Sequence, residues 1–184
     1  MLRPEYPIET ERLLLRPYRE ADIDVLHDIQ SRPEVVRYLY WEPRTREQVE
    51  RVIRESSDEI ELEGNALELA IQPRGSETMV GDVVLMYRSE AHRQGEIGFV
   101  LHPDHQGHGY ATEAAREMLR LGFEQLGLHR IAGRLEARNS ASAAVLERLG
   151  MRLEAHLREN EWVKGEWQSE LVYAMLATEW ATRQ

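Results

Sequence analysis

The 184-residue sequence contains no cysteine and a single lysine, Lys164, among its 23 basic residues. Without cysteine the chain cannot form disulfides, thiolate zinc sites or a cysteine nucleophile. Lys164 follows Val163 rather than a glycine, which excludes a Walker-type phosphate-binding loop. A Schiff-base lysine would have to be Lys164, which lies in a polar stretch of the sequence without an apolar neighbourhood. These absences remove several large classes of enzyme.

Long apolar runs are also missing. Runs such as residues 83–86 are far shorter than the roughly 20 residues of a membrane-spanning helix, and residues 1–5 are not followed by the apolar segment of a secretory signal. We therefore expect a cytoplasmic protein that binds no membrane. The 33 acidic residues give a net charge of −10, which disfavours nucleic acid and favours a cationic amine as partner. Negative charge also serves solubility alone.

The length and the hydrophobic periodicity predict one domain, residues 1–184, with an α+β fold. Antiparallel neighbours followed by a βαβ crossover imply a mixed sheet, mostly antiparallel, with helices packed on its faces. The expected strands are residues 8–16, 66–72, 79–87, 95–101, 131–137, 152–163 and 166–177. The expected helices are residues 22–31, 45–63, 109–126 and 139–149.

The segment from Glu96 to Thr112 carries the clearest functional signal. An apolar strand leads through Gly107 and Gly109 directly into a helix N-terminus. The amide groups and the helix dipole at such a place can hold a pyrophosphate, although a tight turn that binds nothing has the same pattern. The segment is not a dinucleotide-binding fingerprint, because Thr112 stands where a third glycine belongs.

Four segments together resemble the GNAT N-acetyltransferases. Residues 106–111, Gln-Gly-His-Gly-Tyr-Ala, resemble the Gln/Arg-x-x-Gly-x-Gly/Ala loop that holds the pyrophosphate of acetyl coenzyme A in that family. Residues 10–17 and 33–39 are similar to the opening of the RimJ/RimL-type branch. Residues 139–142 and 149–151 resemble its Asn-x-x-Ser…Gly-Phe segment, with methionine in place of the usual phenylalanine. The resemblance covers nearly the whole chain.

The resemblance implies a GNAT fold whose strands splay apart at a coenzyme A cleft. The pantetheine would add itself to the strand that ends at residues 100–102, and the amides of residues 107–112 would take the pyrophosphate. Asn139 would hydrogen-bond the pantetheine arm, although its position also fits an N-cap of the helix that follows. The residues that the resemblance implies for the cofactor are Val100, Leu101, His102, Gln106, Gly107, His108, Gly109, Tyr110, Ala111, Thr112, Asn139 and Ser142.

Acetylation of an amine requires a group that accepts the amine proton. Glu96 is the first candidate, because an acid that opens an apolar central strand is costly unless it is used. A salt-bridged residue at the end of a strand would explain Glu96 equally simply. Glu170 is the second candidate, since the branch often has aspartate where this chain has Ser169.

The leaving thiolate and the oxyanion need partners as well. Many members of the family use a tyrosine as proton donor at the position that Leu146 occupies here, so that assignment fails. The RimJ/RimL-type branch uses a serine, which corresponds to Ser142 and which could instead cap the helix. A backbone N–H group at Val100 or Leu101 would stabilise the oxyanion.

The sequence gives weaker signals for the acceptor pocket and for a metal site than for the cofactor loop. Tyr40 and Trp41 precede the helix expected from Thr45, where GNAT proteins shape the acceptor pocket, although aromatic residues, Trp162 and Trp167 among them, are core residues by default. The three histidines at positions 102, 105 and 108 lack the i, i+4 spacing of a helical zinc site. We expect no metal.

These observations predict an enzyme that moves acetyl from acetyl coenzyme A to a primary amine by direct attack in a ternary complex. The branch implies a protein N-terminus, an amino acid analogue, a polyamine or an amino sugar as acceptor. The alternative is a non-catalytic regulatory module that binds coenzyme A, which Leu146 and Ser169 favour. A homodimer is compatible with the sequence.

Overall fold

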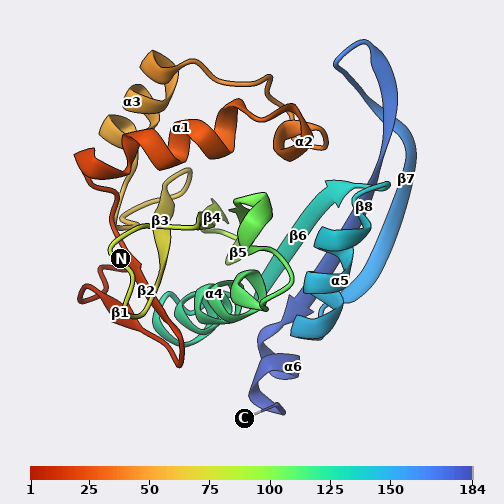
Figure 1. The fold of residues 1–184 in the computed structure, drawn as a ribbon. Helices are drawn as coiled ribbons and strands as arrows, with labels where there is room; N and C mark the ends of the chain where they lie inside the picture. The colour runs from red at the N-terminus through yellow and green to blue at the C-terminus, as the bar shows by residue number, and fades with distance from the viewer. Residues whose placement is uncertain (184) are drawn as a thin grey trace.

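A computed structural model, which describes residues 1–183, contains one eight-stranded sheet with helices on both faces (Figure 1). The strands are β1 (Ile8–Glu9), β2 (Leu13–Arg16), β3 (Ala66–Pro73), β4 (Gly81–Ser89), β5 (Gln94–Leu101), β6 (Arg130–Glu136), β7 (Arg152–Val163) and β8 (Glu166–Leu176). Their spatial order is β1-β2-β3-β4-β5-β6-β8-β7. Neighbours run antiparallel except β5 and β6, which run parallel. The predicted α+β fold with a mixed, mostly antiparallel sheet is confirmed.

The helices divide between the two faces of the sheet. On one face, Leu26 and Ile29 of α1 pack with Val49 of α3 in a small core. On the other face, buried residues of α4, among them Met118 and Leu119, pack in the main core. No helix within residues 1–183 is long and apolar enough to cross a lipid bilayer. The helices are α1 (Ile23–Ser31), α2 (Pro33–Val36), α3 (Arg46–Glu55), α4 (Tyr110–Arg120), α5 (Ser140–Leu149) and α6 (Ala177–Ala181).

Two element predictions near the N-terminus are wrong. The strand expected over residues 8–16 is a hairpin, because Thr10 exchanges hydrogen bonds with Leu13 and turns the chain back. The helix expected to reach residue 63 ends at Glu55, and Ile60 instead forms a β-bridge with Leu2. Thr45 caps the start of α3 as expected, since its hydroxyl oxygen accepts a hydrogen bond from the Gln48 amide.

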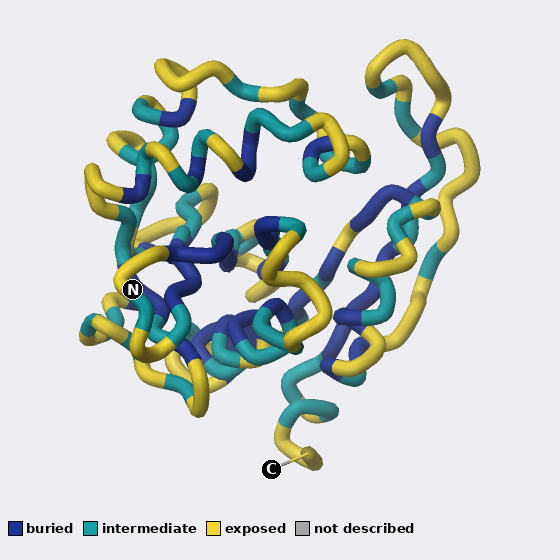
Figure 2. Tube along the Cα trace, viewed as in Figure 1, coloured by how far each residue is buried: buried dark blue, intermediate teal, exposed yellow. Residues whose placement is uncertain are grey.

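The prediction that Trp162 and Trp167 are core residues is also wrong. They lie 61% and 58% exposed near the tip of the β7–β8 hairpin, which extends beyond the rest of the sheet (Figures 1 and 2). Their ring centroids are 5.3 Å apart, so each ring covers part of the other. Cross-strand pairing of two large rings is thus a way to place tryptophan at the surface of a hairpin.

A buried ion pair fixes the chain where it leaves β2. The Nη1 and Nη2 atoms of Arg16 donate to the two carboxylate oxygens of Asp22 at 2.7 and 2.8 Å. The Nε atom of Arg16 donates to the Gln72 side-chain oxygen at 2.5 Å. Both charged side chains are almost completely buried. The pair therefore holds the corner that contains Tyr18, a residue of the cavity described below.

We expect Arg16→Met to lower the free energy of unfolding by about 3–5 kcal/mol, because it leaves the Asp22 carboxylate buried without its partner. Urea denaturation measures the change. The matched control is Arg74→Met, which removes an exposed ion pair with Glu9 and should cost less than about 1 kcal/mol. Equal costs for the two variants would contradict the structural role of Arg16.

Candidate active site

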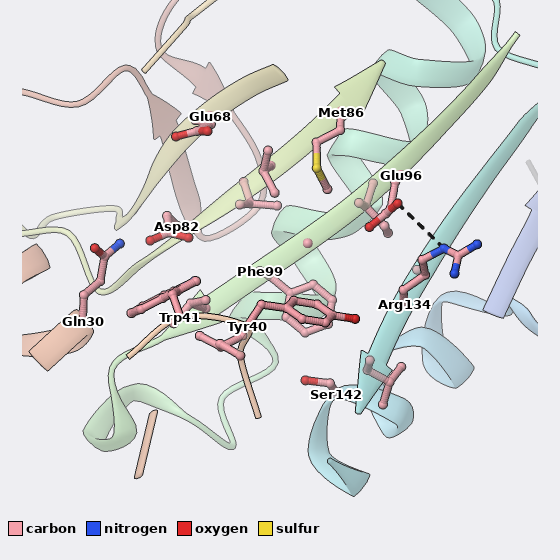
Figure 3. A pocket seen from close by; sticks show the side chains of 18 of the residues that line it. Gln30, Tyr40, Trp41, Glu68, Asp82, Met86, Glu96, Phe99, Arg134 and Ser142 are labelled. Atoms are coloured by element: carbon pink, nitrogen blue, oxygen red, sulfur yellow. Dashed lines mark ion pairs between the residues drawn. The ribbon is translucent and has the colours of Figure 1, made fainter. Parts of the chain in front are cut away.

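The site is built on the divergence of two neighbouring strands. The parallel pairing of β5 with β6 comprises three residue pairs, from Gln94 with Arg130 to Glu96 with Ala132. Beyond Glu96, β5 stays paired with β4 and β6 stays paired with β8. A cavity of about 630 Å³ lies over this divergence (Figure 3), and strands β4, β5 and β6, helix α5 and the segment before α3 line it.

Two glycines allow the backbones to come close around the cavity. A Cβ atom on Gly81 would lie 2.2 Å from the carbonyl oxygen of Val100. A Cβ atom on Gly133 would lie 2.8 Å from the Leu146 side chain, which packs there between α5 and β6. Leu146 is buried and lines the cavity, so the structure places no hydroxyl at this position.

The glycine turn before α4 has the geometry of an anion-binding loop. Gly107 and Gly109 have φ values of 79° and 81°, which favour glycine. Before the turn, the last backbone amide that donates a hydrogen bond is that of Gln106. After the turn, the first is that of Glu113, which donates to the Gly109 carbonyl. Within residues 1–183, the six amides of residues 107–112 donate to no protein group. These amides lie at the N-terminus of α4, where the helix dipole favours a negative charge.

Hydrogen bonds among Thr10, Arg12 and Glu113, which we call the clamp on Glu113, fasten this turn to the N-terminal hairpin. The sequence did not reveal them. The Thr10 hydroxyl and the Arg12 amide donate to Oε1 of Glu113 at 2.6 and 2.7 Å, and Arg12 Nε donates to Oε2 at 2.7 Å. Arg12 Nη1 also donates to the His108 carbonyl at 2.8 Å. Although burial opposes its charge, these hydrogen bonds hold the pKa of Glu113 below its usual value. Arg12 thereby offsets the charge of a carboxylate next to the glycine turn.

Glu96 lines the cavity, and it is also ion-paired. Its Oε2 atom lies 3.0 Å from Arg88 Nε and 4.0 Å from Arg134 Nε (Figure 3). The side chain is 16% exposed. The two guanidinium groups fix the position of the carboxylate at the edge of the cavity.

Glu170 lies behind Arg134 rather than in the wall of the cavity. It accepts a hydrogen bond from Arg134 Nη1 at 2.9 Å and one from the Tyr40 hydroxyl at 3.4 Å. Its side chain is almost completely buried. The structure therefore brings Glu170 to the site through Arg134, a residue that the sequence did not single out.

Asn139 and Ser142 lie side by side at the start of α5, as the sequence predicted. The Asn139 side-chain oxygen accepts a hydrogen bond from the Ser142 amide at 3.1 Å, so Asn139 is the N-cap of the helix. Both residues line the cavity. The amide group of the Asn139 side chain keeps its two N–H donors beyond this cap.

The aromatic residues before α3 form the opposite wall of the cavity. Tyr40 and Trp41 both line it (Figure 3), and Tyr40 is 61% exposed rather than a core residue. The Arg44 guanidinium lies 4.2 Å from the centre of the Trp41 ring. Lys164, at the turn of the β7–β8 hairpin, donates to the Val36 carbonyl at 2.6 Å. This contact ties the hairpin to α2 on the same side of the cavity.

The side chain of His102 is engaged with Asp28 rather than with the cavity. Its ring is mostly buried, and its Nε2 atom lies 2.8 Å from Asp28 Oδ2 on α1. Its Nδ1 atom accepts a hydrogen bond from the Asp104 amide. Its backbone amide donates to the Val80 carbonyl, and its carbonyl accepts from the His105 amide, so His102 has no free hydrogen-bond donor for a ligand.

The sequence did not reveal a partly buried acidic group at the far end of the cavity. Asp82 on β4 and Glu68 on β3 line the cavity together with Tyr18, Gln30 and Arg44. The Oδ2 atom of Asp82 is shielded from solvent, and it accepts no hydrogen bond within the described chain. Burial, and then the charge of Glu68, raise the pKa of Asp82 to about 7, against the opposing effect of Arg44. Burial also raises the pKa of Glu68.

The raised pKa of Asp82 predicts a pH-dependent cost to stability. The folded state prefers the protonated form, so the stability that Asp82 confers is complete below about pH 4 and is lost as the pH rises to about 7. We expect Asp82→Asn to gain roughly 2–4 kcal/mol over the wild type between pH 4 and pH 8. Urea denaturation over this range, with the exposed Glu77→Gln as control, measures the difference. A difference that does not change with pH would contradict the assignment.

Comparisons with known proteins agree on one family. The model of the acetyltransferase (GNAT) domain matches residues 12–152. The chain is 30% identical to the uncharacterized N-acetyltransferase YnaD of Bacillus subtilis over 94% of this chain and 98% of that protein. It is 26% identical to the spermidine N(1)-acetyltransferase of Vibrio cholerae over 85% and 88% of the two chains.

A solved structure has the same fold and extends this agreement to three dimensions. The acetyltransferase (GNAT family) of Bacillus anthracis superposes with a TM-score of 0.85 at 30% identity, over 94% of this chain and 99% of that one. The divergence of β5 from β6 and the glycine turn before α4 lie inside the matched domain. The chain therefore belongs to the GNAT acetyltransferase family and is an acyltransferase.

Proposed function

We propose that the protein transfers an acetyl group from acetyl coenzyme A to a primary, cationic amine by direct attack in a ternary complex. The observation that carries this proposal is the set of amides at residues 107–112, in the turn between β5 and α4, that donate to no group within residues 1–183. These amides take the pyrophosphate. The pantetheine then follows β5 into the gap that β6 leaves.

The pantetheine arm pairs with the free edge of β5. The His102 amide donates to the Val80 carbonyl on the β4 side, and amides alternate in direction along a strand. This alternation directs the Leu101 amide into the gap, which favours Leu101 over Val100 as donor to the pantetheine or the oxyanion. Gln106 lies at the start of the loop, and Asn139 and Ser142 face the arm from α5. The match of residues 10–17 and 33–39 favours the RimJ/RimL-type branch.

The reaction needs one base and little acid catalysis. The amine nitrogen attacks the thioester carbon, the carbon–sulfur bond breaks, and the proton of the amine passes to Glu96 directly or through a water. The Ser142 hydroxyl donates a hydrogen bond to the departing thiolate, which takes its proton from Glu96 or from water. Because a thiol has a pKa of roughly 8.5, this second transfer contributes little to the rate. Glu170 holds Arg134, and through it the position of Glu96.

The acceptor enters on the side of Tyr40 and Trp41. Acidic residues of the β7–β8 hairpin are largely paired with arginine, as Glu154 and Glu166 show, so they attract a cation weakly. The attraction must come from carboxylates inside the cavity. The name of the Vibrio cholerae relative, a spermidine acetyltransferase, supports a small polyamine over a protein N-terminus.

The test is turnover with a panel of amines at saturating acetyl coenzyme A. The panel comprises monoamines, polyamines, amino sugars and peptides with a free N-terminus, and the readouts are thiol release and the mass of the product. We expect acetylated product with a small cationic amine. Binding of acetyl coenzyme A without thiol release for any amine would contradict the proposal and favour a non-catalytic module.

We expect Gly109→Val to weaken the binding of acetyl coenzyme A by about tenfold or more, or about 1.4 kcal/mol. A side chain there is strained at a φ of 81°, and its Cβ atom would lie 3.2 Å from Arg12 Nη2. Calorimetry measures the affinity. The control is Gly75→Val, which has a φ of 82° in a turn with nothing within 4 Å and should leave the affinity unchanged. Unchanged binding in a folded Gly109→Val protein would rule out the phosphate loop.

We expect Glu96→Gln to lower kcat/KM by roughly 10²–10⁴ while the affinity for acetyl coenzyme A stays unchanged. The amide keeps the shape of the side chain but cannot accept the amine proton. Steady-state kinetics over a range of pH measure the effect, with the exposed Glu77→Gln as the charge-matched control. A wild-type rate at every pH would transfer the role of base to another group.

A further inference from the structure

The floor of the cavity carries carboxylates at two separate places. Asp82 pairs across the strands with Val100, and Glu96 pairs with Met86. Asp82 and Met86 are four residues apart on β4 and face the same side of the sheet, so the two register positions are about 13 Å apart. Figure 3 shows Asp82 and Glu68 at one end of the cavity and Glu96 with Arg134 at the other.

One carboxylate oxygen of Asp82, at the end of the cavity away from Glu96, has no hydrogen-bond donor within the described chain. We call Tyr18, Gln30, Arg44, Glu68 and Asp82 the acidic end of the cavity. The Oδ2 atom of Asp82 is shielded from solvent and has no partner among residues 1–183. Buried polar atoms in native proteins are nearly always hydrogen-bonded, so an unpartnered one that faces a cavity marks a place where a ligand can donate. The Glu96 end differs, because two arginines already serve its carboxylate.

The charges at the acidic end do not balance. Asp82 and Glu68 face one guanidinium group, that of Arg44, which is engaged with the Gln30 side chain at 2.9 Å and with the Trp41 ring. Tyr18, from the segment after β2, is neutral, and its hydrogen bond to the Asp82 carboxylate lowers the pKa of Asp82 without supplying a charge. When both carboxylates are ionised, one negative charge stays uncompensated. Burial and the charge of Glu68 accordingly raise the pKa of Asp82 to about 7, which favours a proton as the missing positive charge.

We propose that the acidic end of the cavity binds a second cationic group of the acceptor, one that is not acetylated. An ammonium group supplies the donor that Asp82 Oδ2 lacks and the single positive charge that Asp82 and Glu68 require. This proposal rests on the proposed function and narrows its substrate class. The acceptor is a diamine, or another amine with a remote ammonium or guanidinium group, that spans from the Glu96 end to the acidic end.

Two consequences distinguish this subsite from general attraction by a negative surface. The preferred acceptor has an optimal separation of its two nitrogens, which the roughly 13 Å between the two register positions limits. Binding of the second cation also displaces the proton from Asp82, so diamine binding near pH 7 releases protons.

The kinetic test compares unbranched α,ω-diamines of increasing length with monoamines of the same length. We expect the wild type to prefer diamines of intermediate length by about tenfold or more in kcat/KM, the equivalent of one charged hydrogen bond. Asp82→Asn should remove this preference by raising KM for diamines at unchanged kcat, and should leave monoamines within about twofold. Glu68→Gln should act in the same direction, and the exposed Glu77→Gln should change nothing.

A binding test that needs no turnover separates this proposal from the proposed function. Calorimetry of 1,8-diaminooctane with the protein–coenzyme A complex, in two buffers of different ionisation enthalpy, should show proton release at pH 7 that Asp82→Asn abolishes. Such release without acetylation of any amine would overturn the proposed function and support the subsite. Acetylation without preference for diamines, or without an effect of Asp82→Asn, would overturn the subsite alone. An equal loss of kcat for diamines and monoamines would overturn it too, and would make Asp82 a catalytic residue.

Discussion

The pairing of β5 with β6 stops after three residue pairs, and the rest of the site depends on this divergence. The sheet tolerates it because each strand keeps its other neighbour, β4 for β5 and β8 for β6. Each strand then presents unpaired backbone groups towards the gap, and such groups in the interior of a sheet need a partner. An extended ligand with its own amides is a suitable partner, which connects the topology of the sheet to the pantetheine of coenzyme A. Asn139 and Ser142, at the N-terminus of α5, line the cavity over this gap.

Ion pairs with arginine determine which carboxylates of the site remain available to bind a ligand. Nearly all basic residues of the chain are arginine, and the forked guanidinium group engages carboxylates at fixed positions. Glu96, Glu113 and Glu170 each have such a partner. At the acidic end the guanidinium of Arg44 is instead engaged with a side-chain amide and an aromatic ring. The net charge of −10 is therefore weak evidence for a cationic acceptor. The local charge imbalance around Asp82 is stronger evidence.

Local signals in the sequence predicted the parts of the site that lie within one segment. The glycine turn of residues 106–111 and the Asn139 cap are each a few residues long, so their geometry follows from their own residue types. The acidic end combines residues from five separate segments, and the clamp on Glu113 joins residues about a hundred positions apart. Such contacts depend on strand register, which a single sequence does not reveal. In the sequence, Asp82 is one polar residue in an apolar strand, without a visible partner.

Two aspartates near the same corner of the fold, Asp22 and Asp82, differ in how their carboxylates are served by hydrogen bonds. The oxygens of Asp22 accept hydrogen bonds from both Nη atoms of Arg16 and from the Arg19 amide, so its burial stabilises the fold. Asp82 has a shielded oxygen without a donor, and its ionisation opposes folding as the pH rises towards 7. Replacing its carboxylate by an amide would relieve that cost at no loss of volume. A residue that lowers stability and faces a cavity is therefore better explained by what enters the cavity than by the fold that surrounds it.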